Sequence, residues 1–299
     1  MSALTVLQVG FGVATQDLGR PGFSDMGLGA AGAADRGSAA LANRLVGNRP
    51  DAAVLEALLG SVTLRTDAYV AVATAGAACP VEIERADGRV RGAASHEVLM
   101  LAPGDTLRIG TATAGLRSYI AVLGGFAVEP VLGSRSWDSL ARLGPPPSSP
   151  GDVLPIGDAR ASWPIVDAVP QPDEHWPDDP VVLDVTAGPR DDWFTPDWRD
   201  TLTRQDFTVG SDSDRVGVRT TAPQPLVRAV THELPSEGVE TGSLQVPPEG
   251  FPVLFLADHP VTGGYPVVAV LTPESVDRAA QLRPGDTIRF RLVHRRPAR

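Results

Sequence analysis

The sequence predicts a mainly β protein made of two barrel- or sandwich-like halves. Short apolar runs recur along the chain, with Gly, Pro and Asp turn signals between them. The stretch "PGDTLR" at 103–108 returns as "PGDTIR" at 284–289, and this repeat favours two related barrels. Prolines are concentrated between residues 144 and 180. We therefore predict an N-terminal half over 1–143, a Pro-rich linker and covering segment over 144–180, and a C-terminal half over 181–299.

The predicted strands are runs of four to seven residues dominated by apolar side chains. In the first half they cover 5–9, 52–58, 61–66, 69–74, 81–86, 96–101, 106–110 and 117–123. In the second half they cover 181–187, 207–210, 215–220, 226–230, 242–246, 253–257, 267–272 and 287–293.

A few short helices interrupt these strands, and the first begins at Asp35. Asp35 is a good N-cap for the stretch 36–47, in which Leu41 and Leu45 fall on one apolar face. Gly47, followed by Asn48, ends the run. The capping signals therefore predict a helix that starts and stops at defined residues.

Two further helices are expected in the second half. The stretch 191–202 has helical composition, but Pro196 interrupts it. At 272–282 the signals are stronger, because Thr272 is a good N-cap and Pro273 suits the first turn.

The charged residues exclude several kinds of chemistry. All 26 basic residues are arginine, because the sequence contains no lysine. A Walker A lysine, a lysine Schiff base and a biotinylated lysine on this chain are therefore impossible. The formal net charge of -10 argues against a nucleic-acid partner. Arginine remains available for bidentate binding of carboxylates or phosphates.

The remaining composition indicates a cytoplasmic protein without a metal site. No apolar run reaches the ~18 residues that a membrane span needs, and the first residues lack a signal-peptide pattern. The single cysteine, Cys79, has no flanking positive charge, which favours a buried structural thiol. The five histidines show no metal-ligand spacing.

Four polar clusters are the candidate sites. They are "TQDLGRPG" at 15–22, the helix region 35–48, "SDSDRVGVR" at 211–219 and the glycine-rich segment 242–266. Each has a structural alternative, since turns and hairpins use the same residues. The candidate side chains are, cluster by cluster, Gln16, Asp17 and Arg20; Arg36 and Asn43; Asp214 and Arg215; and Gln245, Asp258, Thr262, Gly263, Gly264 and Tyr265.

The glycine pattern "GLGAAG" at 27–32 matches a dinucleotide fingerprint only superficially. Such a site needs a buried strand directly before it, and a loop-like "RPGFSDM" precedes it here. We expect these glycines to allow close approach to a ligand or to the start of the Asp35 helix.

In combination the clusters resemble the biotin-dependent carboxyltransferase family, which includes the second subunit of allophanate hydrolase and the C subunit of prokaryotic 5-oxoprolinase. The resemblance runs nearly end to end through "TQDLGRPG", "DR…ANRLVGN", "LE…LG", "RSYIAVLGGF…PVLGSRS", "GDVLPI", "SDRVGVR", "SEG", "GSLQVPPEG", "LADHPVTGGYP" and "DRAAQLRPGD". One departure is His259-Pro260, where the family usually has Arg-Gln.

The resemblance implies a pair of cyclophilin-like β-barrel halves and work beside partner subunits, one smaller and of related fold, another lactamase-like. It implies a role in ATP-dependent opening of 5-oxoproline to glutamate, with ATP bound by this chain or by the complex. One alternative is the carboxyltransferase component of a urea- or amide-carboxylating system, with biotin on another chain. A second is a non-catalytic protein that sequesters its smaller partner.

Residue types suggest roles for a small carboxylate or amide substrate. Arg20, Arg36 or Arg215 could bind its carboxylate, and the Gly263-Gly264 amides could polarise its carbonyl oxygen. Asp258 or Asp17 could transfer a proton.

Overall fold

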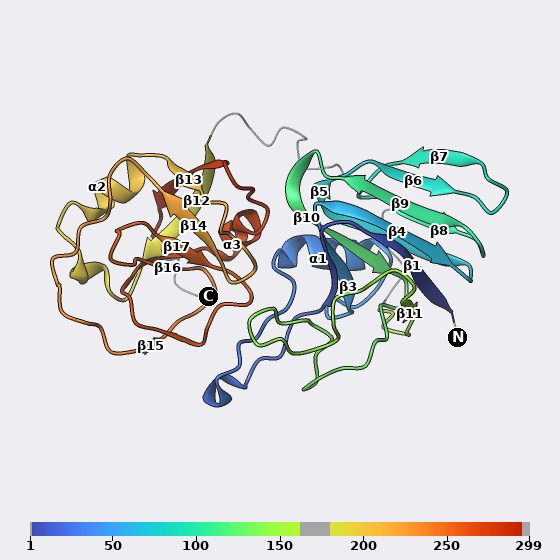
Figure 1. Ribbon diagram of the computed structural model, residues 1–299, viewed down its shortest axis with the longest axis horizontal. Coiled ribbons are helices and arrows are strands. Elements are labelled where there is room, and N and C mark those ends of the chain that lie inside the picture. Colours follow the sequence, from blue (N-terminus) through green and yellow to red (C-terminus); the bar gives the residue numbers. More distant parts are fainter. Residues whose placement is uncertain (1, 162–179, 295–299) are drawn as a thin grey trace. The chain divides into compact units, whose positions relative to one another are not determined.

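The structure, a computed structural model, describes residues 2–161 and 180–294 (Figure 1). Its chain divides into two compact units. Unit 1 comprises Met1–Arg20, Ala31–Asp138 and Arg142–Trp176, and unit 2 comprises Pro21–Ala30, Ser139–Ala141 and Pro177–Arg299. Two short segments of the N-terminal half therefore belong to the C-terminal unit.

The described residues of unit 1 form two antiparallel sheets and one helix. The six-stranded sheet has the order β11 (Val153–Pro155), β1 (Ala3–Val9), β4 (Gly60–Thr66), β9 (Thr106–Thr111), β6 (Val81–Glu84) and β7 (Val90–Ala93). The five-stranded sheet has the order β2 (Val13–Gln16), β3 (Val54–Leu58), β10 (Ala114–Val122), β5 (Val70–Ala78) and β8 (Val98–Leu101). The helix is α1 (Arg36–Leu45).

The two faces of the five-stranded sheet have different side chains because strand residues alternate. Val72 and Ile120 join the main core with residues of the six-stranded sheet such as Leu64. On the other face, Ala73 and Ala75 of β5 lie in a cluster with the apolar stripe of α1. Small side chains let the helix lie close to the sheet (Figure 1).

Unit 2 is a closed seven-stranded barrel with short helices at its ends. The strand order is β12 (Val181–Ala187), β19 (Val267–Leu271), β16 (Ser243–Gln245), β17 (Val253–Phe255), β14 (Gly217–Thr221), β13 (Phe207–Val209) and β20 (Thr287–Leu292), and a parallel pairing of β20 with β12 closes it. A separate ribbon joins β15 (Glu237–Gly238) and β18 (Thr262–Gly263). The helical elements of this unit are η1 (Ser24–Met26), η2 (Asp191–Trp193), α2 (Trp198–Thr203) and α3 (Pro273–Ala279).

The repeated Pro-Gly-Asp stretch forms the same turn in both units. The Asp105 carboxylate accepts from Ala102 N at 2.8 Å, and Asp286 accepts from Arg283 N at 2.8 Å. Gly104 and Gly285 both adopt positive φ, 87° and 91°. The turns lead into β9 and β20, each of which pairs with an antiparallel neighbour. The repeat in the sequence therefore corresponds to a repeat in the structure.

The mainly β prediction and the three helix predictions are confirmed. Asp35 accepts from Ser38 N at the start of α1, and Thr272 accepts from Ser275 N at the start of α3. The stretch around Pro196 is split into η2 and α2, as a proline in its middle requires.

Three details differ from the predicted elements. Residues 226–230 form no strand, because the amides of Ala229 and Val230 both donate to the Trp193 carbonyl, and only an isolated bridge remains at Arg228. The short strands β2, β7, β11, β15 and β18 have no counterpart among the predicted runs. The strand β11 lies in the segment predicted as linker, yet it pairs with β1 of unit 1.

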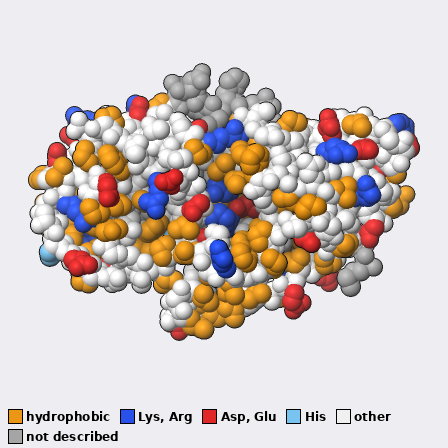
Figure 2. All heavy atoms as spheres, viewed as in Figure 1, with side chains coloured by type: hydrophobic (Ala, Val, Ile, Leu, Met, Phe, Trp, Pro, Cys, Tyr) orange, Lys and Arg blue, Asp and Glu red, His pale blue; other side chains and the backbone are white. Residues whose placement is uncertain are grey.

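On the face in Figure 2, acidic and basic side chains alternate with exposed hydrophobic ones. Among the described residues, no helix is both long and apolar enough to cross a membrane.

Candidate functional site

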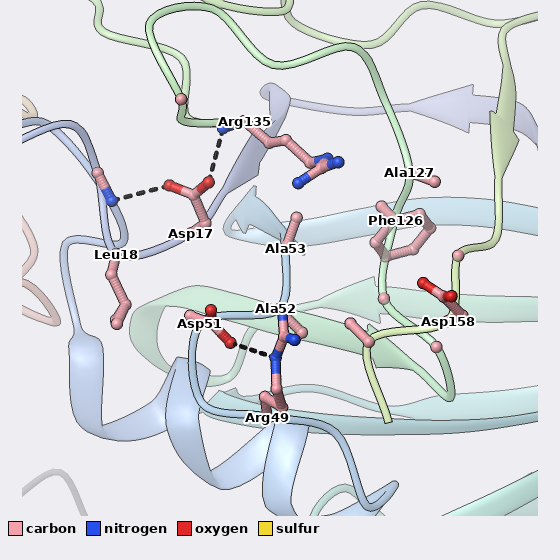
Figure 3. Close-up of a pocket in the computed structure, with 16 residues that line it drawn as sticks. Asp17, Leu18, Arg49, Asp51, Ala52, Ala53, Phe126, Ala127, Arg135 and Asp158 are labelled. Carbon is pink, nitrogen blue, oxygen red and sulfur yellow. Dashed lines mark hydrogen bonds and ion pairs between the residues drawn. The ribbon is translucent and has the colours of Figure 1, made fainter. Parts of the chain in front are cut away.

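Unit 1 contains a polar pocket of ≈ 310 Å³ (Figure 3). Its walls come from five loop segments, some of which are more than a hundred residues apart in the sequence. These loops are 17–19, 49–53, 124–127, 133–135 and 157–159. Phe126 and small alanines form the apolar part of the lining, and the charged side chains come from Arg and Asp residues.

The geometry of one wall depends on Asp17. Its carboxylate accepts four hydrogen bonds, from Gly19 N (2.8 Å), Ser134 Oγ (2.6 Å), Ser136 Oγ (2.6 Å) and Arg135 N (2.6 Å). These bonds fix the 133–136 loop against the turn at 17–19. Both oxygens of Asp17 are thus engaged in holding the loop.

Gln16 and Arg20 lie buried beside the same loop. Gln16 Nε2 donates to Trp137 O at 3.0 Å, and one Nη of Arg20 donates to Ser136 O. Within the described part of the chain, Gln16 Oε1 and the Nε and Nη1 of Arg20 have no hydrogen-bonding partner. Gly144 is required beside them, since a Cβ there would lie 2.1 Å from Ser136 O and its φ is +112°.

Gly32, the last glycine of the "GLGAAG" pattern, packs against the backbone of the 17–19 turn. A Cβ at this position would lie 3.0 to 3.1 Å from the backbone of Asp17, Leu18 and Gly19, and φ is +100°. The preceding element is η1 rather than a strand, which agrees with the interpretation against a dinucleotide site.

A buried polar network holds the start of α1. Glu56 Oε2 accepts from Ala34 N (3.0 Å) and from the Tyr119 hydroxyl (2.8 Å), and that hydroxyl oxygen accepts from Asp35 N (2.8 Å). Burial and then the nearby Glu56 carboxylate raise the pKa of Tyr119 well above its usual value. The Tyr119 hydroxyl is therefore protonated at neutral pH and donates to Glu56.

Asn43 of α1 supports the part of the pocket wall that contains Ala52 and Gly124. Its Nδ2 donates to Ala52 O at 2.8 Å, and its Oδ1 accepts from Asn48 Nδ2 at 2.9 Å. Asn48 Oδ1 then accepts from Gly124 N at 2.8 Å. Arg36, seven residues before Asn43, is exposed at the first position of the helix. The two predicted residues of this helix therefore have different environments.

In unit 2, Asp258 and Arg215 form a closed ion pair. Arg215 donates from Nε (2.8 Å) and Nη2 (3.0 Å) to the two carboxylate oxygens. Ser139 donates to the same carboxylate from its N (2.9 Å) and Oγ (2.6 Å). Asp258 is 1% exposed. Asp214 is exposed and accepts from Val216 N at 2.8 Å, as in a turn.

The glycine-rich segment of unit 2 packs around Gln245. Its Nε2 donates to Tyr265 O at 3.1 Å. A Cβ on Gly263 would lie 2.2 Å from that nitrogen, so a larger residue there would displace the end of the Gln245 side chain. Gly263 belongs to β18, and Thr262, Gly264 and the Tyr265 side chain are exposed.

At His259-Pro260, where the sequence departs from the family pattern, the histidine ring contacts the carbonyl of the following proline. His259 Nδ1 lies 2.7 Å from Pro260 O, and the ring stacks on Phe255 with centroids 5.7 Å apart. A Cβ on Gly29 would lie 3.2 Å from His259 O. The pair is thus part of the packing that receives the 21–30 segment within unit 2.

The structure brings only some of the predicted residues together. In unit 2, Arg215 pairs with Asp258 and Gln245 packs against Gly263. Arg36 of unit 1 and Asp214 of unit 2 are exposed. Asp17 lines the pocket, and Gln16, Arg20 and Asn43 support its walls. Four charged residues of the lining were not predicted from the sequence, namely Arg49, Asp51, Arg135 and Asp158. Arg135 lies within "PVLGSRS", a segment already quoted for the resemblance, but its place in a pocket depends on the fold.

The pocket can bind a small polar molecule. Arg49 Nε contacts Asp51 at 3.0 Å, which neutralises that pair, while Arg135 donates from Nε to Val128 O at 2.8 Å. Asp158 is exposed on the 157–159 loop. Among the described residues, no group of three or more His, Cys, Asp or Glu side chains is arranged to hold a metal ion.

The fold and these segments define a carboxyltransferase-type protein. The model of the family "Carboxyltransferase domain, subdomain A and B" matches residues 26–292, and the chain belongs to this family. It is 32% identical to the C subunit of 5-oxoprolinase from Escherichia coli, over 96% of this chain and 90% of that protein.

Solved structures are similar over the same range. The crystal structure titled TTHA0988 is 33% identical with a TM-score of 0.83, over 97% of this chain and 55% of that one. The Kluyveromyces lactis urea amidolyase structure is 28% identical with a TM-score of 0.84. The match covers 96% of this chain and 18% of the amidolyase chain.

Proposed function

We propose that this chain is a subunit of an ATP-dependent 5-oxoprolinase, which opens the lactam of 5-oxoproline to give glutamate. The observation that supports this proposal most is the extent of the match to the E. coli 5-oxoprolinase component. It covers nearly all of both chains, whereas the similar region is a small part of urea amidolyase.

The chemistry requires activation, because water does not open an unstrained lactam at a useful rate. Phosphorylation of the lactam oxygen by ATP, with release of ADP, weakens the amide resonance of the ring. Water then adds at the carbonyl carbon and the ring nitrogen leaves as the amine, which produces an acyl phosphate. A second water hydrolyses this acyl phosphate to glutamate and inorganic phosphate. We assign ATP binding to the complex, since this chain has no lysine for a P-loop.

The contribution of this chain is then the binding and orientation of the substrate. Arginine is suited to the carboxylate of 5-oxoproline. Of the predicted proton-transfer residues, Asp17 and Asp258 already accept four hydrogen bonds each. We propose that both organise loops and that proton transfer belongs to another residue or another subunit.

The test is to co-express this chain with a smaller subunit of related fold and a lactamase-like subunit. ATP-dependent formation of glutamate from 5-oxoproline is expected only when all three chains are present. Full turnover without this chain would contradict the proposal.

A second function is favoured by the similarity to urea amidolyase, whose structure superposes at a TM-score of 0.84. In that case the chain would be a carboxyltransferase component, with biotin on another chain because no lysine is present here. Carboxylation of urea in the presence of a biotinylated carrier, without 5-oxoproline turnover, would favour this function over the first.

A further inference from the structure

The Arg135 guanidinium is held in a fixed orientation in the pocket of unit 1. The backbone N–H of Arg135 donates to Asp17 Oδ2 at 2.6 Å, and the side-chain Nε of Arg135 donates to Val128 O at 2.8 Å. In the described chain, its two Nη groups have no other hydrogen-bonding partner. Figure 3 shows the guanidinium extending from the 133–135 loop into the pocket. A planar pair of donors is therefore preorganised there.

Asp158 lies on a different wall of the same pocket (Figure 3). The backbone around it is fixed, because Gly157 N donates to Gly125 O at 2.9 Å and Ala159 N donates to Gly124 O at 2.8 Å. Over the described residues, its carboxylate makes neither a hydrogen bond nor an ion pair. Over the described residues, an unpaired carboxylate therefore lines the same pocket as the Arg135 guanidinium.

The other charged groups of the lining are already satisfied. The Asp17 carboxylate accepts four hydrogen bonds, and Arg49 pairs with Asp51 at 3.0 Å. What remains is one cation, one anion and an apolar surface that includes Phe126. At ≈ 310 Å³ the pocket is at the small end of the range for ligand sites.

We propose that this pocket binds a small carboxylate that also carries an N–H group next to the carboxylate-bearing carbon, such as a lactam or α-amino acid. The Nη groups of Arg135 bind the carboxylate, and Asp158 accepts the N–H and so determines specificity. The choice of 5-oxoproline as the test ligand rests on the proposed function. The assignment of Arg135 and Asp158 as the binding residues rests on the structure alone.

The test is calorimetric titration of the purified full-length chain with three probes. L-5-oxoproline has both groups, its lactone analogue replaces the ring N–H by oxygen, and 2-pyrrolidinone lacks the carboxylate. L-5-oxoproline is expected to bind about 10-fold more tightly than the lactone, which is the contribution of one hydrogen bond to a charged group. The difference from 2-pyrrolidinone is expected to be at least ~10-fold, because that analogue loses the bidentate contact with Arg135.

Variants separate the two roles. Arg135→Ala and Arg135→Lys are expected to weaken binding by at least ~10-fold, because lysine lacks the bidentate fork. Arg91→Ala removes the same charge from exposed β7, outside the pocket, and is expected to change binding by less than about 2-fold. Asp158→Ala is expected to abolish the preference for the lactam over the lactone while the lactone still binds.

Two results overturn the proposal. One is the absence of binding to L-5-oxoproline at ~10 mM, and the other is an equal effect of Arg135→Lys and Arg91→Ala. Binding is measured without partner subunits. Turnover by the complex without binding here would therefore disprove the pocket assignment alone, and binding without turnover would disprove the enzymatic function alone.

Discussion

At the scale of single residues, the carboxylates that sequence reasoning selects as catalytic are fully engaged in hydrogen bonds within the protein. Asp17 and Asp258 each accept four hydrogen bonds. A carboxylate in a tight glycine turn has the same sequence signature whether it serves a loop or a substrate. Stability measurements distinguish the two roles.

Asp17→Ala is expected to lower the free energy of unfolding by about 2–4 kcal/mol, because four donors lose their acceptor. Chemical denaturation measures the change. Asp158→Ala is the matched control, since the carboxylate of this aspartate in the same unit makes no hydrogen bond or ion pair over the described residues, and it should be within about 0.5 kcal/mol of wild type. Equal stability of the two variants would show that the Asp17 bonds do not hold the loop.

Asp258→Asn is expected to destabilise unit 2 by about 2–4 kcal/mol, because Arg215, with a side chain 14% exposed, loses its counter-ion. The same denaturation experiment applies, with Asp214→Asn as the exposed neighbour for comparison. If Asp258→Asn kept full stability and lost only turnover in the reconstituted complex, the catalytic role predicted from the sequence would be restored.

At the scale of elements, caps and turns followed the sequence closely. Asp35 and Thr272 are N-caps in the structure, as their positions before apolar runs predicted. Strand prediction was less accurate where a segment is short. The run 226–230 has apolar composition, but three of its amides donate to the carbonyls of Gly250 and of Trp193 at the end of η2. The sequence did not indicate β11, because this strand lies in a Pro-rich segment. A three-residue edge strand can form there, since it needs few backbone N–H donors.

The Pro-Gly-Asp turn before β9 should make stability depend on acid. Burial acts to raise the pKa of Asp105, but hydrogen bonds from Ala102 N, Arg85 and Ala86 N outweigh it, so the pKa in the folded protein is lower than usual. The charged carboxylate therefore stabilises the fold above about pH 4, and this contribution is lost as the pH falls through the lowered value.

The measurement is the free energy of unfolding of wild type and Asp105→Asn between about pH 3 and 7. The difference between the two proteins is expected to be largest near pH 7 and to shrink as the pH falls below about 4. A difference that stays constant over this range would contradict the assigned role of the charge.

At the scale of the whole molecule, residues 21–30 and 139–141 of the N-terminal half belong to unit 2. Ser139 donates two of the hydrogen bonds to Asp258. The polypeptide therefore passes from one unit to the other more than once.

A protease site inserted at Pro170 tests this organisation. After cleavage, the two fragments are expected to elute together in size-exclusion chromatography, because fragment 1–170 still supplies two segments of unit 2. The Asp258→Ala variant removes the acceptor for Ser139 and should weaken the association. Separate elution of the wild-type fragments would contradict the division into these two units.

The sequence by itself determined the mainly β class, the helix caps, the repeated turn and the excluded lysine chemistry. These features depend on local backbone preferences and on composition, which neighbouring residues fix. Only the tertiary structure showed that Asp17 holds the loop of Arg135 and that Asp158 lies in the same pocket. Asp17 is separated from both residues by more than a hundred positions along the chain, and nothing in a linear pattern specifies which strand ends meet. The packing of two sheets around one core decides that.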